Sequence, residues 1–244
     1  VPTLKSVNME IQPGEVVGVI GPSGAGKSTL ARALTGVWLP LSGHVRLDGA
    51  DIDNWDPELL GPHIGYLPQD VELFSGTIAE NIARFSEIDS GMVVAAAKKA
   101  GVHEMVLQMP DGYNTRIGEA GRSLSGGQRQ RIGLARALYG DPKFIILDEP
   151  TSVLTPQEAD EVLGLMRGLA HAGEVSVLMI THKFREVTAF ADDVTVLRKG
   201  AMVGSCAVAD TTVEALSGWM MGRAPTHNTV VARPPVNEKV EPCL

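Results

Sequence analysis

The stretch from Val16 to Thr29, VVGVIGPSGAGKST, constrains the fold of this 244-residue chain more than any other. A short β-branched run, a glycine-rich loop and then helical spacing predict a buried strand, a tight loop and a helix. In such a loop the amides of Gly24, Gly26 and Lys27 form a concave nest for an anion, and Lys27 reaches the β and γ phosphates. An ordinary glycine-rich turn does not need a lysine and a hydroxyl directly after its last glycine. We therefore expect a phosphate-binding loop.

The same loop is expected to help hold a magnesium ion. The hydroxyl of Ser28 is an oxygen ligand of the kind that Mg²⁺ prefers beside phosphates. The residues expected to contact the nucleotide are Gly21, Pro22, Ser23, Gly24, Ala25, Gly26, Lys27, Ser28 and Thr29.

Strands and helices alternate along the rest of the chain. Two further apolar runs, Phe144–Asp148 and Val175–Ile180, predict buried parallel strands. Helical spacing covers Ser28–Thr35, Gly126–Leu138 and Glu158–Ala170. This alternation predicts an α/β fold with a doubly wound parallel sheet.

Three other segments depart from this alternation. Leu41–Ile52 and Ala191–Ser205 each have the pattern of two strands joined by a turn. Residues Ser86–Asp111 are helical in pattern and rich in alanine and valine, which indicates a separate helical lobe. From Ala224 onward the chain has four prolines and no periodicity, so we expect a tail or linker there.

Composition limits the classes of function. The chain is 44% hydrophobic and 20% charged, enough for a real core, and its net charge of −8 argues against nonspecific nucleic-acid binding. Its two cysteines, Cys206 and Cys243, lie far apart and outside any metal-ligand spacing, which favours a reducing compartment. No apolar run approaches the roughly 20 residues that span a bilayer. A role at a membrane would therefore need a partner chain.

An acidic pair follows one of the predicted strands. The sequence FIILDEP places Asp148 and Glu149 at the strand end. Such pairs are often solvated caps, but beside a phosphate-binding loop they suit catalysis better. We expect Asp148 to coordinate Mg²⁺ and Glu149 to take a proton from an attacking water molecule.

Two further side chains follow short apolar runs. His182, in MITHK, could hydrogen-bond the γ-phosphate and orient water, although a lone histidine is more often a surface residue. Its place after a parallel strand, where open α/β sheets hold their ligands, favours the functional reading. Gln69, in YLPQD, is weak evidence when taken alone.

The segment RSLSGGQRQR, Arg122 to Arg131, is an unusual helix start. Ser125 and Gln128 fit a capping box, but this leaves Gly126 and Gly127 unexplained. Glycines allow close backbone approach, and a helix N-terminus binds anions. The sequence therefore predicts an anion site. The arginines Arg129, Arg131 and Arg136 could favour phosphate locally, but we expect them to lie on a solvated helix face.

These motifs, in this order, resemble the ATP-binding cassette family from the start of the chain to about Arg223. The resemblance implies a P-loop NTPase core with a parallel sheet, an N-terminal antiparallel β subdomain and a helical lobe at about residues 86–140. It places an ABC ATPase domain at residues 1–223 and a proline-rich tail or linker at residues 224–244. It also implies ATP and Mg²⁺ as cofactors.

The resemblance implies roles for single residues as well. Catalysis is expected of Glu149, His182, Gln69 and Lys27, with Ser28, Gln69 and Asp148 at the metal. Two cassettes, identical or different, are expected to pack head to tail, so that Ser125, Gly126, Gly127 and Gln128 close over the ATP held by the partner's loop. This arrangement is implied by the family and not by the spacing of the residues.

The expected function is ATP hydrolysis that powers a membrane transporter, through ATP-driven dimerisation. The expected partner is a permease domain or subunit, and no nucleic acid is expected to bind. We expect the assembled domain to lie at the cytoplasmic face of the membrane and the isolated domain to be soluble. The segment Arg116–Gly121 resembles the part of exporters that couples to membrane domains. The alternatives are a non-transport cassette ATPase, or a mosaic or engineered cassette that binds nucleotide with little turnover.

Three features depart from the family pattern. Family members usually have an aromatic residue, upstream of the first strand, that stacks on adenine, and this chain begins at Val1, after that position. We therefore expect it to bind ATP more weakly than an intact relative does. The segment Ser152–Thr155 reads SVLT where exporters commonly have SALD, and Thr155 begins a capping box there. Finally, the earlier motifs resemble type I protein-secretion exporters, whereas the part after Pro150 resembles sugar or nucleoside importers, which suggests a possible chimera.

Overall fold

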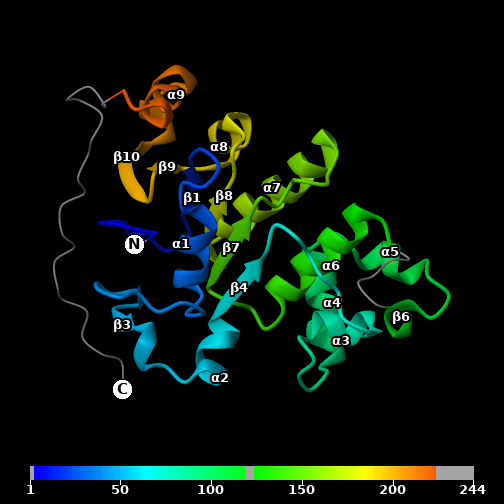
Figure 1. Cartoon of the computed structure of the whole chain (residues 1–244). Coiled ribbons are helices and arrows are strands. Elements are labelled where there is room, and N and C mark those ends of the chain that lie inside the picture. The colour runs from blue at the N-terminus through cyan, green and yellow to red at the C-terminus, as the bar shows by residue number, and fades with distance from the viewer. Residues whose placement is uncertain (1–2, 119–123, 224–244) are drawn as a thin grey trace.

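Six strands form the central sheet of the computed structural model, which describes residues 3–118 and 124–223. Their order is β10-β9-β1-β8-β7-β4, and β10 runs antiparallel to β9 while the other neighbours pair in parallel (Figure 1). The strands are β1 Val16–Ile20, β4 Ile64–Leu67, β7 Phe144–Asp148, β8 Ser176–Ile180, β9 Asp193–Arg198 and β10 Ala201–Ala207. The predicted α/β fold with a mostly parallel sheet is confirmed.

Nine α-helices accompany this sheet within the described residues. They are α1 Lys27–Leu34, α2 Pro57–Leu60, α3 Ile78–Ile82, α4 Ser90–Lys99, α5 His103–Leu107, α6 Gly126–Leu138, α7 Pro156–His171, α8 Phe184–Phe190 and α9 Val213–Met221. The predicted helices are present, and α7 begins two residues earlier than expected because Thr155 caps it and Pro156 occupies its first position. No described helix is both long and apolar enough to cross a membrane.

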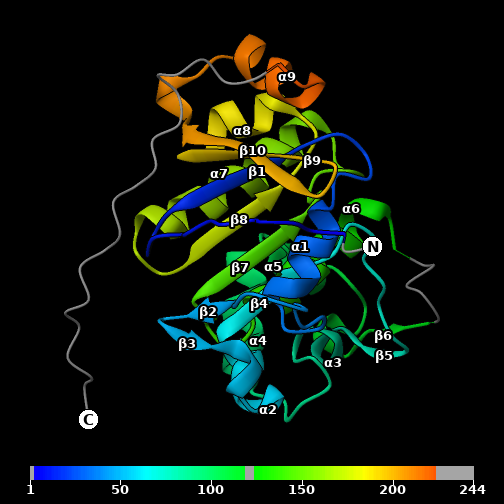
Figure 2. The same cartoon turned by 60° about the vertical axis from the view of Figure 1, so that its left-hand side comes forward.

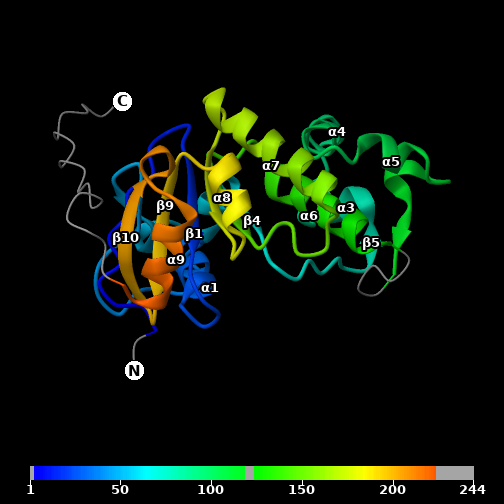
Figure 3. The ribbon, with the colours of Figure 1, turned by 90° about the horizontal axis from the view of Figure 1, so that it is seen from above.

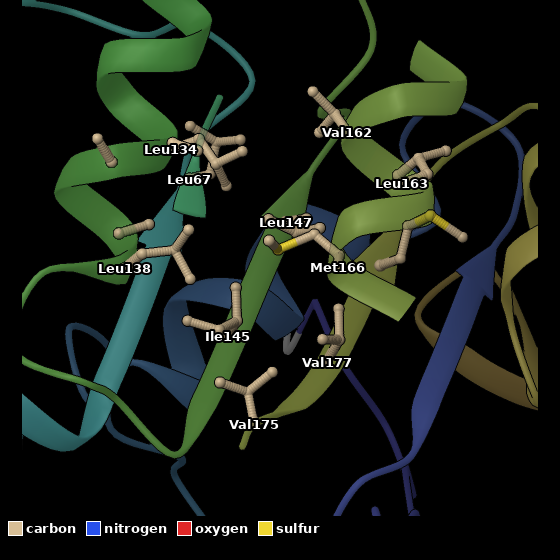
Figure 4. Packing of buried hydrophobic residues seen from close by; sticks show 14 of the residues in the cluster. Leu67, Leu134, Leu138, Ile145, Leu147, Val162, Leu163, Met166, Val175 and Val177 are labelled. Carbon is tan, nitrogen blue, oxygen red and sulfur yellow. The ribbon is translucent and has the colours of Figure 1, made fainter. Parts of the chain in front are cut away.

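Helices cover both faces of the sheet, which explains why its strands are apolar without interruption. On β7, Ile145 and Leu147 pack into one cluster with α6 and α7, whereas Phe144 and Ile146 pack into a second cluster with α1. Figure 4 shows the first cluster, where leucines of α6 and Met166 of α7 meet over β7. Alternate residues of one strand therefore build two separate cores.

Two small antiparallel sheets lie outside the central one. The first pairs β2 (Arg46–Leu47) with β3 (Ala50–Asp51), as the sequence predicted, and lies with α2 beyond the β4 edge, while α9 lies beyond the other edge (Figure 2). The second pairs β5 (Gly76–Thr77) with β6 (Arg116–Ile117). The pair at Lys199, formed by β9 and β10, is also confirmed.

Helices α3, α4 and α5 gather at the end of the molecule opposite β9 and β10, with α6 and α7 between (Figure 3). Both α3 and α4 pack against α6, and α6 in turn packs on β4. This arrangement resembles the expected helical lobe, whose boundaries at residues 86–140 stay a prediction. The expected tail, at residues 224–244, and the end of the coupling segment lie outside the described residues.

Arg136 corrects one expectation for α6, because it does not lie on a solvated face. Its guanidinium donates to the carbonyl and side-chain oxygens of Asn81 and lies 5.5 Å from the ring centroid of Phe74. Burial lowers its pKa. The expectation was wrong because α3 covers this side of α6. The Arg131 side chain is also largely covered, with 19% of it exposed, and it forms an ion pair with Glu161 of α7.

Candidate active site

The parallel strands bring their carboxyl ends to one edge of the sheet, and the predicted catalytic residues follow these ends. The loop after β1 contains Lys27, β7 ends at Asp148, and His182 follows β8. Adjacent strands are in register there, with Asp148 opposite Ile180. Residues far apart in the sequence are thereby brought together, as in other open α/β sheets.

The glycine-rich loop has the backbone shape of an anion nest. Gly24 and Gly26 have φ of 73° and 101°, in the left-handed region that side chains disfavour. Gly26 is also the N-cap of α1 and provides no side-chain cap, so the first amides of the helix stay available to a ligand. The Lys27 ammonium donates to the carbonyl of Gly21 at 2.9 Å and therefore lies against the same loop.

Asp148 is almost fully buried at the end of β7, with 3% of its surface exposed. Burial raises the pKa of its carboxyl, and the neighbouring Glu149 charge raises it further, while a hydrogen bond from Ser28 and the Lys27 charge oppose this. The pKa of Tyr66, on the neighbouring strand β4, is raised by burial and by the Asp148 charge.

The surroundings of Asp148 fit a magnesium ion. Its Oδ1 atom is buried without a hydrogen-bond partner among the described residues, which is costly unless a ligand satisfies it. The Ser28 side chain interacts with the same carboxyl group and opposes the rise of its pKa. A carboxylate and a hydroxyl are the oxygen donors that Mg²⁺ takes beside nucleotide phosphates. Gln69 lies exposed two residues beyond β4, at the same edge of the sheet.

Glu149 and His182 contact each other directly. The His182 Nδ1 atom lies 2.8 and 2.9 Å from the two carboxylate oxygens of Glu149. Glu149 is 10% exposed at its side chain and His182 is 63% exposed, so the pair connects the buried strand end to open solution. Glu149 also has a φ of 50°, and such strain in a non-glycine residue is typical of functional sites.

The predicted capping box at α6 is present. The Ser125 hydroxyl accepts from the Gln128 amide at 3.2 Å, and the Gln128 side chain accepts from the Ser125 amide at 2.8 Å. The nearest neighbours that a side chain at Gly126 or Gly127 would meet are Val153 and Glu158, around the start of α7. These residues therefore lie at two adjacent helix starts and not in their own chain's phosphate loop.

Sequence reasoning missed a buried polar cluster beside this site. Thr151, Thr181 and Glu186 are each at most 2% exposed, and both threonine hydroxyls donate to the Glu186 carboxylate. The only signal in the sequence is a carboxylate placed four residues after His182, on a helix face that packs against the sheet. Charged side chains on helices are usually solvated, so this signal is weak.

Comparison with known proteins identifies the family of the chain. The family model described as ABC transporter matches residues 4–152. The chain is 48% identical over 200 residues to the type I secretion system ATP-binding protein PrsD of Rhizobium meliloti (strain 1021). This alignment covers 82% of this chain and 34% of that protein. It is 43% identical over 204 residues to the leukotoxin translocation ATP-binding protein LktB of Mannheimia haemolytica, covering 82% and 28%.

A solved structure gives the same result. The structure of a bacterial Atm1-family ABC exporter with ATP bound matches with a TM-score of 0.77 and 34% identity, over 85% of this chain and 36% of that one. The chain thus spans about a third of the length of these relatives. A match of 200 residues cannot end before Pro150, so the likeness to PrsD continues past the suggested seam. From its motifs, its fold and these matches, we conclude that the chain belongs to the ABC transporter family, as an ATP-binding domain.

Proposed function

We propose that this domain hydrolyses ATP to power a membrane exporter, and that it does so as a head-to-tail pair of cassettes on the cytoplasmic face of the membrane. The observation that carries the proposal is the contact between Glu149 and His182 next to the buried, orphaned carboxylate oxygen of Asp148. A base, a polar side chain facing solution and an oxygen ligand for a cation are the groups that phosphoryl transfer to water requires.

Each group has a distinct task in this proposal. The loop around Lys27 binds the β and γ phosphates, and its fixed amides stabilise the charge that develops on them. Glu149 accepts the proton of the attacking water molecule, while His182 holds the γ-phosphate and keeps the Glu149 carboxylate in place. Asp148, Ser28 and Gln69 would hold Mg²⁺, which neutralises phosphate charge when bound.

The second cassette completes the site. The start of α6 packs near the start of α7 and lies at the surface of the protomer. Ser125 is exposed, and Gly126 and Gly127 are half-buried. A helix start with a serine and two glycines suits the γ-phosphate of a neighbouring chain. Two identical faces of this kind fit a two-fold dimer.

A permease domain is the proposed second partner. A groove of about 800 Å³ runs between α2 and the start of the α3 region, lined in part by Trp55, Leu60, Phe74 and Phe85. Phe74 and Phe85 are 56% and 48% exposed, and exposed aromatic residues beside a groove are typical of a protein interface. We propose that the membrane-spanning partner docks here.

The importer-like character of the segment after Pro150 remains a hypothesis about the origin of the chain. It does not change the proposed activity, because Asp148 and Glu149 before this point and His182 after it form one site. Comparison with the full-length parent gene would decide between a natural mosaic and a joined sequence.

The central test is phosphate release by the purified chain and by Glu149→Gln. We expect the substitution to reduce turnover by about 100-fold or more, because it removes the proton acceptor, while ATP binding persists. With ATP and Mg²⁺, light scattering should show Glu149→Gln as a stable dimer. Turnover equal to that of the unaltered chain would refute the assignment of Glu149.

A further inference from the structure

We infer that Glu186 is a positioning residue for hydrolysis, because its buried carboxylate joins the turn that carries Glu149 to the loop that carries His182. The inference rests on the proposed function, since it concerns two residues assigned there to the attacking water and the γ-phosphate. Glu186 itself touches neither the nucleotide nor the reacting atoms in this account.

Glu186 is buried, and each of its carboxylate oxygens accepts a hydrogen bond. Its Oε1 atom accepts from the Thr151 hydroxyl at 2.5 Å, and its Oε2 atom accepts from the Thr181 hydroxyl at 2.8 Å. The Lys183 ammonium lies 3.1 Å from Oε1 and donates to the Thr151 hydroxyl at 2.8 Å. We call these four residues, Thr151, Thr181, Lys183 and Glu186, the carboxylate clasp.

The clasp connects the two loops that follow β7 and β8, beyond the last paired residues of these strands. The ladder between β7 and β8 ends at Asp148 and Ile180, and one further bond joins the Glu149 amide to the Ile180 carbonyl. Thr151 lies two residues after Glu149, and Thr181 directly precedes His182. The clasp therefore fixes both loops relative to each other one step beyond the strand ends.

His182 needs such support because packing does not hold it. Its side chain is 63% exposed, and its hydrogen bond to Glu149 determines where the ring lies. The Glu186 carboxylate and both threonine hydroxyls are buried, whereas Lys183 is 39% exposed at its side chain. Hydrogen bonds to a buried charged acceptor are strong in a medium of low dielectric constant. The clasp therefore sets the distance between the Glu149 carboxylate and the His182 ring.

Glu186→Gln is the first test, because it keeps the shape and removes the charge. In this variant the side-chain amide nitrogen, which cannot accept a hydrogen bond, faces one of the two threonine hydroxyls that donate to Glu186. Lys183 also loses the negative charge with which it pairs. We expect kcat for ATP hydrolysis to fall by about 10- to 100-fold, since small misplacements at a reacting centre have effects of this size. The KM for ATP should stay within about two-fold, because the Lys27 loop follows a different strand.

Arg185→Gln is the matched control on the same helix turn. The Arg185 guanidinium is exposed and pairs with Asp160 on α7, outside the clasp. We expect kcat and KM to be unchanged in this variant.

A double-mutant cycle with His182→Ala separates positioning from stability. If Glu186 acts through His182, then Glu186→Gln should reduce single-turnover hydrolysis little further once His182 is removed. Additive losses, or an unchanged kcat with only a lower melting temperature, would overturn the inference. A crystal structure of Glu186→Gln gives a readout without turnover: the His182 ring should leave hydrogen-bond distance of Glu149, and an unchanged contact would also overturn it.

Thr151 provides the same test if Glu186→Gln fails to fold. Thr151→Val removes the hydroxyl at similar volume and should lower kcat, whereas Thr151→Ser keeps the hydroxyl and should have the kcat of the unaltered chain.

The proposed function and the inference about the clasp can fail independently of each other. Unchanged turnover in Glu149→Gln refutes the proposed function, while loss of turnover there with an additive cycle refutes the clasp alone.

Discussion

At the scale of single residues, Asp148 shows a conflict between the proposed chemistry and the stability of the nucleotide-free chain. Its carboxyl is buried, one oxygen has no hydrogen-bond partner among the described residues, and its pKa is raised by burial and by Glu149. An acid whose pKa is higher in the folded state than in the unfolded state contributes most to the stability of the fold when it is protonated. Its contribution to stability is present at low pH and is lost as the pH rises through the folded-state pKa.

Asp148→Asn should therefore raise the melting temperature of the nucleotide-free chain at neutral pH. The gain should shrink as the pH falls toward the range where Asp148 is itself protonated. Each kcal/mol of stabilisation corresponds to about 2–4 °C for a domain of this size. Calorimetry from pH 4 to pH 8 would measure the difference, and ATP with Mg²⁺ should stabilise the unaltered chain more than the variant. A variant that melts lower than the original at neutral pH would contradict this account.

At the scale of helices, α6 and α7 begin in the same way but are proposed to do different things. Both start with a complete capping box, Ser125 with Gln128 and Thr155 with Glu158. Each box satisfies free amides and stabilises its own helix. Only the α6 start is proposed to meet a partner's nucleotide, so the two helices form a matched pair for experiment.

Ser125→Ala and Thr155→Ala should each lower stability by about 1 kcal/mol, as the loss of a helix cap usually does. Their melting temperatures should thus fall by similar amounts. Only Ser125→Ala should also weaken ATP-driven dimerisation of the Glu149→Gln background, as measured by analytical ultracentrifugation. Equal loss of dimerisation in both variants would mean that Ser125 acts as a cap and nothing more.

At the scale of the whole molecule, the proposed site is divided between two chains. The Lys27 loop lies at the sheet edge, whereas the start of α6 lies against the start of α7. In a head-to-tail dimer, one protomer provides the first and its partner provides the second. Each dimer then contains two such composite sites.

Mixing two inactive variants tests this division. Lys27→Ala should lose the phosphate nest, and Ser125→Arg should block the site of the partner. In a mixed dimer, one of the two sites combines the intact loop of Ser125→Arg with the intact helix start of Lys27→Ala. Random pairing should restore about a quarter of the original ATPase activity. No recovery over either variant alone, with dimers present, would contradict composite sites.

The sequence by itself determined most strands of the central sheet, the phosphate loop and the order of the predicted catalytic groups. Lys27, Asp148, Glu149 and His182 could be found because each follows an apolar run, and parallel strands bring such positions to one edge. The capping boxes were equally predictable, since they depend on residues three positions apart. These are local features, so local patterns contain them.

Only the tertiary structure decided which polar side chains are buried and what they meet. Arg136 looked like a surface residue until α3 was seen to cover it, and Glu186 looked like any charged residue of a short helix. Thr151 and Glu186 are hydrogen-bonded across 35 positions of sequence. Their contact exists because β7 and β8 are neighbours in the sheet, and burial makes it strong, which periodicity along the chain cannot express.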